Sequence, residues 1–218
     1  NPPEIADAMA RCGWSLVQLD SVNHRVRYLA QGVAIHLGAV GKGYALDRAA
    51  AVLRGRGVEV ALLSGGGSSV TAIGAPPGEK GWGVGVVHPL EPSRRLGTVV
   101  VRNASLSTSG AEKEFFEVDG RRFGHILDPR TGWPATAAQR VTVVAPTGRH
   151  AEAFSTAFAV LPTAAIARCC ASRPHLGVVQ VSLGEEARVA ARFGSWDRAG
   201  EAPTGAAWFW EEEEDESP

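Results

Sequence analysis

The sequence predicts an α+β fold in which helices pack on largely antiparallel or mixed sheets. Strand-like apolar runs outnumber helical segments, and short turn-forming stretches such as residues 74–78 and 119–120 join many of them as hairpins. The chain has 218 residues, 44% of them hydrophobic, which is the size and composition of one domain with a substantial core. We therefore expect a single domain over residues 1–207 and an acidic tail over residues 208–218, which contains the run EEEEDE.

Helices are expected where apolar residues recur at helical spacing and where alanine and leucine dominate. The helical ranges are 5–12, 44–53, 150–161 and 164–172, with Gly55 and Gly57 after the second and Pro162 after the third. Strands are expected where apolar runs stand between turn residues. The strand ranges are 15–19, 25–29, 58–63, 70–73, 81–87, 98–102, 115–118, 122–127, 140–145, 177–182 and 188–193.

The overall composition argues against several classes of partner and site. The chain carries 22 basic and 23 acidic side chains, so its net charge of -1 creates no field that favours nucleic acid or an anionic membrane. No apolar run reaches the length of a transmembrane helix. Cys12, Cys169 and Cys170 have neither a disulfide pattern nor zinc-ligand spacing, and we interpret them as small hydrophobic residues.

The densest group of reactive side chains lies in the segment GHILDPRTGWP, residues 124–134, which follows STSG at residues 107–110. Pro129 fixes its own φ and biases Asp128 toward an extended conformation, so the carboxylate lies at a stiff corner. His125 and Arg130 lie in the same short segment. The alternative is a plain hairpin corner, because Asp, Pro and Gly also mark turns, and this segment alone does not separate the two interpretations.

A second polar group interrupts the apolar helix predicted over residues 150–161. Glu152, Ser155 and Thr156 stand at positions i, i+3 and i+4, so they project from one face. The alternative is that both hydroxyls bond to preceding carbonyls while the carboxylate is solvated. Two glycine-rich stretches, residues 37–43 with Lys42 and residues 64–69, would allow backbone N–H groups to approach a phosphate or another ligand.

Four segments, in this order, resemble one family: the FAD:protein FMN transferases of the ApbE type. The segments are HLGAVGKGYALDRA, LLSGGGSS, LSTSG with GHILDPRTGWPA, and AEAFSTAFAVL, all within residues 35–161. The resemblance implies an ApbE-like fold and a reaction in which FAD binds with Mg²⁺ at its diphosphate. The FMN half then moves to a threonine or serine hydroxyl of an acceptor flavoprotein, and AMP is released. It also implies a periplasmic or cell-envelope location, although no targeting signal is recognisable in these residues.

The resemblance further assigns roles to individual residues. The implied Mg²⁺ ligands are the backbone carbonyl of Ala39 and the side chains of Glu152, Ser155 and Thr156, and such oxygen donors suit a hard cation. The implied catalytic residues are His125, whose neutral imidazole would accept the proton of the acceptor hydroxyl, and Asp128 in the same loop. The implied FAD contacts are His36, Lys42, Leu127, Gly66, Gly67, Thr108, Ser109 and Arg130.

The chain departs from the family pattern at several of these positions. His36 stands where aspartate is usual, Ser64 and Ser68 where asparagine or aspartate is common, and residues 111–114 replace a segment that usually carries tyrosine. Glu152 replaces an aspartate and lengthens the implied metal ligand by one methylene. These departures keep two alternatives open: an FAD diphosphate hydrolase that yields FMN and AMP, and a non-catalytic FAD-binding protein.

Overall fold

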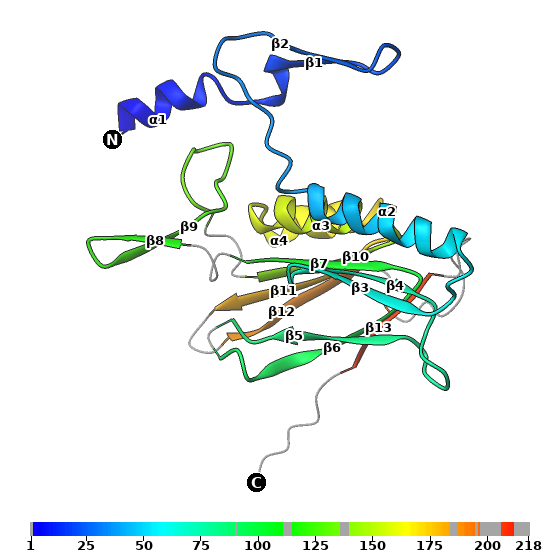
Figure 1. Cartoon of the computed structure of the whole chain (residues 1–218). Coiled ribbons are helices and arrows are strands. Elements are labelled where there is room, and N and C mark those ends of the chain that lie inside the picture. The colour runs from blue at the N-terminus through cyan, green and yellow to red at the C-terminus, as the bar shows by residue number, and fades with distance from the viewer. Residues whose placement is uncertain are drawn as a thin grey trace.

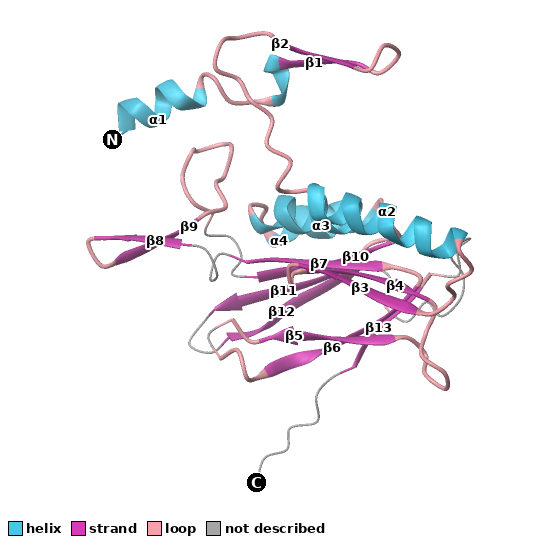
Figure 2. Cartoon of the chain, viewed as in Figure 1, coloured by secondary structure: helices cyan, strands magenta, loops and turns pink. Residues whose placement is uncertain are grey.

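The fold is built around a six-stranded sheet with helices on one face and a smaller sheet on the other. The computed structural model describes residues 2–89, 91–110, 115–135, 140–183, 187–194, 196 and 206–211. Helices α2, α3 and α4 cover the first face of the large sheet, and the three-stranded sheet lies below the second face (Figure 1). Figure 2 shows the same layers coloured by secondary structure. The α+β class predicted from the sequence is confirmed.

The order of strands in the large sheet is β12-β11-β10-β7-β4-β3, and the order in the small sheet is β13-β6-β5. Two hairpins, β1-β2 and β8-β9, complete the described strands, and every strand pairing among the described residues is antiparallel. The helices are α1 (Pro2–Met9), a 3₁₀ turn (Trp14–Leu16), α2 (Gly41–Gly55), α3 (Gly148–Ala159) and α4 (Thr163–Ala171). The strands are β1 (Val17–Asp20), β2 (Arg25–Tyr28), β3 (Ala61–Gly65), β4 (Ser69–Ile73), β5 (Trp82–Val87), β6 (Arg95–Arg102), β7 (Ser105–Gly110), β8 (Phe115–Val118), β9 (Arg121–Gly124), β10 (Arg140–Ala145), β11 (Gly177–Leu183), β12 (Ala187–Gly194) and β13 (Ala207–Glu211).

Two hydrophobic cores hold the three layers together. Val141 and Val143 of β10 face the helices, where Phe158 and Ile166 are fully covered. Val144 of the same strand faces the small sheet, in a core that it shares with side chains of β5, β6 and β13. This alternation is the two-residue period of a strand that is buried on both faces, which explains why RVTVVA contains four apolar residues out of six.

The N-terminal part of the chain lies on the outer side of the helical layer (Figure 1). Helix α1 packs against the loop that contains Gly132, because a Cβ added there would lie 2.7 Å from Ile5 Cγ2 and 3.0 Å from Met9 Sδ. The hairpin β1-β2 follows α1, and its strands match the predicted pair closely. Within the described residues, no helix combines the length and the apolar character needed to cross a membrane.

Several boundaries differ from the sequence prediction. Helix α2 begins at Gly41, three residues before the predicted start, so Lys42 and Gly43 belong to its first turn rather than to a preceding loop. The segment STSG lies within strand β7. The expected boundary between domain and tail at residue 207 falls inside strand β13, which pairs with β6 and buries Trp208. Residues 111–114, where the chain departs from the family pattern, and residues 212–218 of the expected acidic tail lie outside the described residues.

Candidate functional site

A cavity of about 940 Å³ collects most of the predicted site residues. It lies where the first turn of α2, the glycine loop after β3, the end of β7 and one face of α3 meet. It then continues past β5 and the loop after β9. The volume is within the range expected for a small-molecule or cofactor site. The predicted residues that line it are His36, Ala39, Lys42, Gly66, Gly67, Thr108, Ser109, His125, Leu127, Glu152 and Thr156.

Helices α2 and α3 cross in close backbone contact, and this contact brings two of the motifs together. A Cβ added at Gly43 would overlap the carbonyl group of Gly148, so only glycine allows the two helices to approach this closely. Asp47 of α2 accepts hydrogen bonds from the backbone N–H groups of Gly148 (2.6 Å) and Arg149 (3.1 Å). Asp47 therefore caps the N-terminus of α3, where a carboxylate satisfies free donors and complements the helix dipole.

The crossing places the carboxylate of Glu152 next to the first turn of α2. Glu152 is 2% exposed, and its Oε2 accepts a hydrogen bond of 2.7 Å from the backbone N–H of Gly43. Its Oε1 lies 2.5 Å from Nζ of Lys42, a charge contact that lacks the alignment of a hydrogen bond. A carboxylate this deeply buried requires compensating positive charge, which here comes from the ammonium and from the N-terminal end of α2.

A set of hydroxyl groups lies beside Glu152, between β7 and α3. Ser109 Oγ is 2.9 Å from Ser155 Oγ and 3.2 Å from Thr156 Oγ1. Ser155 is completely buried and also donates a hydrogen bond of 3.0 Å to the backbone carbonyl of Glu152. The back-bonding alternative therefore applies to Ser155, which lies behind the cavity wall. Glu152 and Thr156 themselves line the cavity.

His125 and Leu127 line the mouth of the cavity and are both exposed. They lie on a loop that is closed by its own backbone: Asp128 N–H donates to Trp133 C=O at 2.8 Å, and Ala135 N–H donates to Ile126 C=O at 2.8 Å. The turn residue Gly132 has a φ of 74°, a value that glycine adopts without strain.

Asp128 and Arg130 lie on the same loop and form an ion pair, called here the Asp128–Arg130 clamp, that also ties the loop to the end of α3. Arg130 Nε and Nη2 donate to the Asp128 carboxylate at 2.8 and 2.6 Å, and Nη2 also donates to the carbonyl of Val160, at the end of α3, at 2.7 Å. The hydrogen bonds from Arg130 lower the pKa of the Asp128 carboxyl from 3.8 to about 2. Neither residue lines the cavity. In this geometry both side chains fix the loop, and the catalytic role expected of Asp128 and the FAD contact expected of Arg130 stay predictions.

Two further residues shape the site without having been predicted. Asp47 holds α3 in place, and its partners lie about a hundred positions further along the chain. Arg140, at the start of β10, is 7% exposed, lines the cavity, and donates through Nη1 to the carbonyl of Val87 at 2.5 Å. No local sequence pattern reveals the role of Asp47 or Arg140, because each role depends on contacts between segments that are distant in the sequence.

The predicted metal ligands are all oxygen donors. Among the described residues, no cluster of three or more His, Cys, Asp or Glu side chains could hold a metal ion. A cation in this cavity would therefore rely on one carboxylate together with hydroxyl and carbonyl oxygens, a donor set that suits Mg²⁺ and not zinc. Glu152 Oε1 is a buried oxygen without a hydrogen-bond donor, so the residues present fit such a cation.

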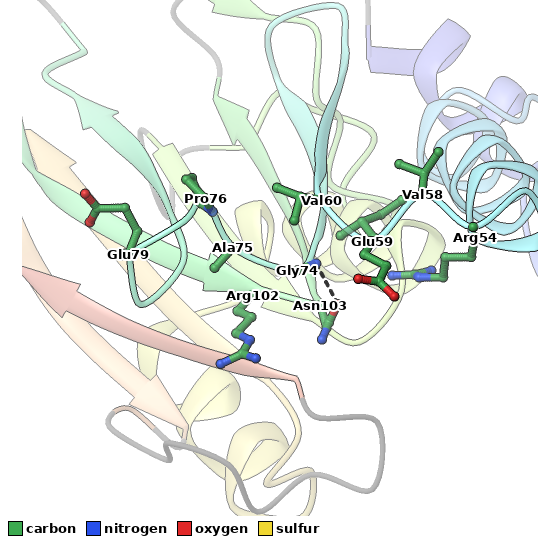
Figure 3. Close-up of a pocket in the computed structure, with 12 residues that line it drawn as sticks. Arg54, Val58, Glu59, Val60, Gly74, Ala75, Pro76, Glu79, Arg102 and Asn103 are labelled. Carbon is green, nitrogen blue, oxygen red and sulfur yellow. Dashed lines mark hydrogen bonds between the residues drawn. The ribbon is translucent and has the colours of Figure 1, made fainter.

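A second cavity of about 620 Å³ lies at the far end of α2 and contains none of the predicted site residues. Arg54, Glu59, Glu79 and Arg102 surround it, and a hydrogen bond of 2.8 Å joins Gly74 N–H to Asn103 Oδ1 at its base (Figure 3). Its charged groups are of both signs, and it is wide open to solvent, so the geometry does not favour a particular ligand.

Comparison with known proteins relates the whole chain to one family. A family model described as the ApbE family matches residues 1–180. The FAD:protein FMN transferase of Treponema pallidum is 33% identical over 213 residues, which cover 91% of this chain and 58% of that protein.

Solved structures give the same relationship. The crystal structure of the ApbE protein of Thermotoga maritima superposes with a TM-score of 0.73 at 33% identity, covering 83% of this chain and 59% of that one. The apo form of the flavinyl transferase ApbE of Pseudomonas stutzeri gives a TM-score of 0.69 at 26% identity, covering 86% and 57%. The chain thus spans little more than half the length of these relatives. The match of the family model over most of its residues shows that this chain belongs to the ApbE family.

Proposed function

We propose that this protein transfers the FMN half of FAD to a threonine or serine hydroxyl of an acceptor flavoprotein, with release of AMP and dependence on Mg²⁺. One observation carries the proposal: a single cavity joins a buried carboxylate and hydroxyl group at one end to an exposed histidine at its mouth. The names of the relatives, FAD:protein FMN transferase and flavinyl transferase, support the same activity for the family.

The inner end of the cavity supplies the oxygen donors for the cation. Glu152, Thr156 and the carbonyl of Ala39 would hold Mg²⁺, with Ser109 orienting the Thr156 hydroxyl in the cavity wall and Ser155 supporting Ser109 from behind. Bound there, the cation would neutralise charge on the FAD phosphate oxygens during an in-line displacement. Ser155 is proposed as a supporting residue because it does not line the cavity.

The glycine loop and the first turn of α2 supply the contacts for the diphosphate. Gly66 and Gly67 line the cavity with φ values of 61° and 67°, a backbone conformation that favours glycine. Lys42 extends over Gly66 from α2, since a Cβ added at Gly66 would lie 3.7 Å from Lys42 Cδ. Phosphate oxygens in this position would meet an ammonium group and the positive end of a helix.

His125 is the proposed general base. Because it is exposed at the mouth of the cavity, a hydroxyl group from another protein can reach it. The hydroxyl oxygen attacks the FMN phosphorus, the bond from that phosphorus to the AMP phosphate oxygen breaks, and the hydroxyl proton passes to the imidazole. The clamp between Asp128 and Arg130 contributes by fixing the loop that carries His125.

The test is AMP release from FAD with Mg²⁺, measured with and without an acceptor peptide that contains a threonine. The transferase predicts acceptor-dependent AMP and a covalently flavinylated peptide. His125→Ala should lower this rate by about 10²–10⁴-fold, the usual contribution of a general base, while FAD still binds. His175→Ala removes an exposed histidine outside the cavity and serves as the control. AMP release without acceptor would identify a hydrolase, and FAD binding without AMP release would identify a binding protein.

We extend the proposal to the organisation and location of the protein. The two cores are continuous with one large sheet, which supports a single domain that reaches at least to β13. A cell-envelope location is proposed from the family resemblance and is tested by fractionation of cells that express the full-length protein.

A further inference from the structure

Lys42 occupies the position of a counter-ion for the carboxylate that is the proposed metal ligand. Its Nζ lies 2.5 Å from Glu152 Oε1, while Glu152 Oε2 is already bound to the backbone N–H of Gly43. The lysine side chain is 46% exposed and the glutamate side chain 3% exposed, so the ion pair joins a half-exposed ammonium to a buried carboxylate. In this arrangement one carboxylate oxygen is hydrogen-bonded and the other has only a charge contact with the ammonium.

This arrangement conflicts with metal binding to the same oxygen. Mg²⁺ binds its oxygen ligands at about 2.0–2.1 Å, which would put a dication and an ammonium within a few ångströms of each other in a buried place. The repulsion between Mg²⁺ and the Lys42 ammonium is weakly screened, because the Glu152 carboxylate that both would contact is almost inaccessible to water. Lys42 has a long flexible side chain and is half exposed, so it can move away, whereas Glu152 is fixed by the helix crossing.

We propose that Lys42 and the divalent cation are alternative counter-ions of Glu152, and that binding of the cation releases the Lys42 ammonium toward the diphosphate of FAD. The inference rests on the proposed function for the identity of the cation and of its substrate. It adds a defined role to Lys42: the lysine stabilises the metal-free site and becomes available for phosphate only after the metal has bound. The exchange balances charge at both stages, since Glu152 never lacks a cationic partner.

The first experiment measures Mg²⁺ affinity by isothermal titration calorimetry, without FAD. Lys42→Met removes the competing ammonium and should tighten Mg²⁺ binding about tenfold, within the roughly 5- to 150-fold range of coupled binding events. The same variant should lower the melting temperature of the metal-free protein by several degrees, because it leaves a buried carboxylate without its ion pair. Lys80→Met removes an equal charge outside the cavity and should leave the Mg²⁺ affinity unchanged.

The second experiment follows the native lysine. Acetylation with an N-hydroxysuccinimide ester, read by mass spectrometry, should modify Lys42 faster when Mg²⁺ is added, with Lys80 as an internal reference. Wild-type protein that binds Mg²⁺ while Lys42→Met binds it equally or more weakly would overturn the exchange but leave the proposed function intact. Wild-type protein that binds no Mg²⁺ and releases no AMP would overturn both. An unchanged Lys42 acetylation rate on metal binding would also overturn the exchange.

Discussion

The helix crossing at Gly43 gives the most direct test of how this site is built. An added Cβ at Gly43 would overlap the Gly148 carbonyl and lie 2.7 Å from the backbone nitrogen of Arg149. Because these are backbone atoms, no side-chain rotation relieves the overlap, and α2 and α3 must separate. Separation also lengthens the hydrogen bond from Gly43 N–H to Glu152, which is 2.7 Å in the native arrangement.

The size of the effect follows from three contributions. Overpacking of a close contact costs about 1–3 kcal/mol of folding free energy. Weakening a hydrogen bond to a charged acceptor costs up to about 1.5–3 kcal/mol. Alanine in place of glycine within a helix returns about 1 kcal/mol. We expect Gly43→Ala to lower the free energy of unfolding by about 2–4 kcal/mol, which corresponds to a fall of roughly 5–15 °C in melting temperature for a chain of this size.

The assay is thermal unfolding followed by circular dichroism, with Gly41→Ala as the matched control. Gly41 lies in the same helical turn, but nothing lies within 4 Å of a Cβ added there. Gly41→Ala should therefore be neutral or stabilising. If Gly43→Ala were as stable as Gly41→Ala, the two helices would not be in the close contact described here, and the placement of Glu152 would have to be revised.

Three further predictions concern the site. The hydrogen bonds from Arg130 lower the pKa of Asp128 to about 2, so the stabilisation by this ion pair is present above pH 4 and is lost as the pH falls toward 2. Arg130→Ala should raise the pKa of Asp128, which a carboxyl ¹³C NMR titration measures. Ser109→Ala removes the hydrogen-bond partner of two hydroxyls and should weaken Mg²⁺ binding about 10–100-fold by calorimetry. Thr156→Ala should also raise the Mg²⁺ requirement, and an unchanged metal titration of that variant would refute Thr156 as a ligand. Asp47→Ala removes the cap of α3 and should lower the unfolding free energy by about 0.5–2 kcal/mol in urea denaturation.

The features that the sequence predicts well are those with a local cause. The helix face with Glu152 and Thr156 follows from the spacing of residues along α3, and both side chains do line the cavity. The loop with His125 contains its own turn residues, so its shape is largely set within eleven positions. The α+β class follows from strand-like runs that short turns connect, and the observed pairings are antiparallel.

The features that the sequence does not reveal depend on distant partners. The sequence suggests a loop containing Asp128 and Arg130, but it does not reveal that Arg130 also donates a hydrogen bond to Val160 at the end of α3. Trp208 precedes an acidic run and resembles the start of a tail, yet pairing of β13 with β6 buries it between the sheets. In each case, the decisive contact joins segments that are 30 or more positions apart.

The charges in the cavity explain why the proposed reaction would need both a cation and FAD. The Glu152 charge is matched by Lys42, so this ion pair offers no surplus positive charge to a diphosphate. A divalent cation would supply that surplus and would in turn be bound more tightly once phosphate oxygens complete its ligands. Such coupling is reciprocal, so each ligand should strengthen the binding of the other by the same factor. The buried glutamate at the crossing of α2 and α3 therefore links the fold to the order in which the site would be filled.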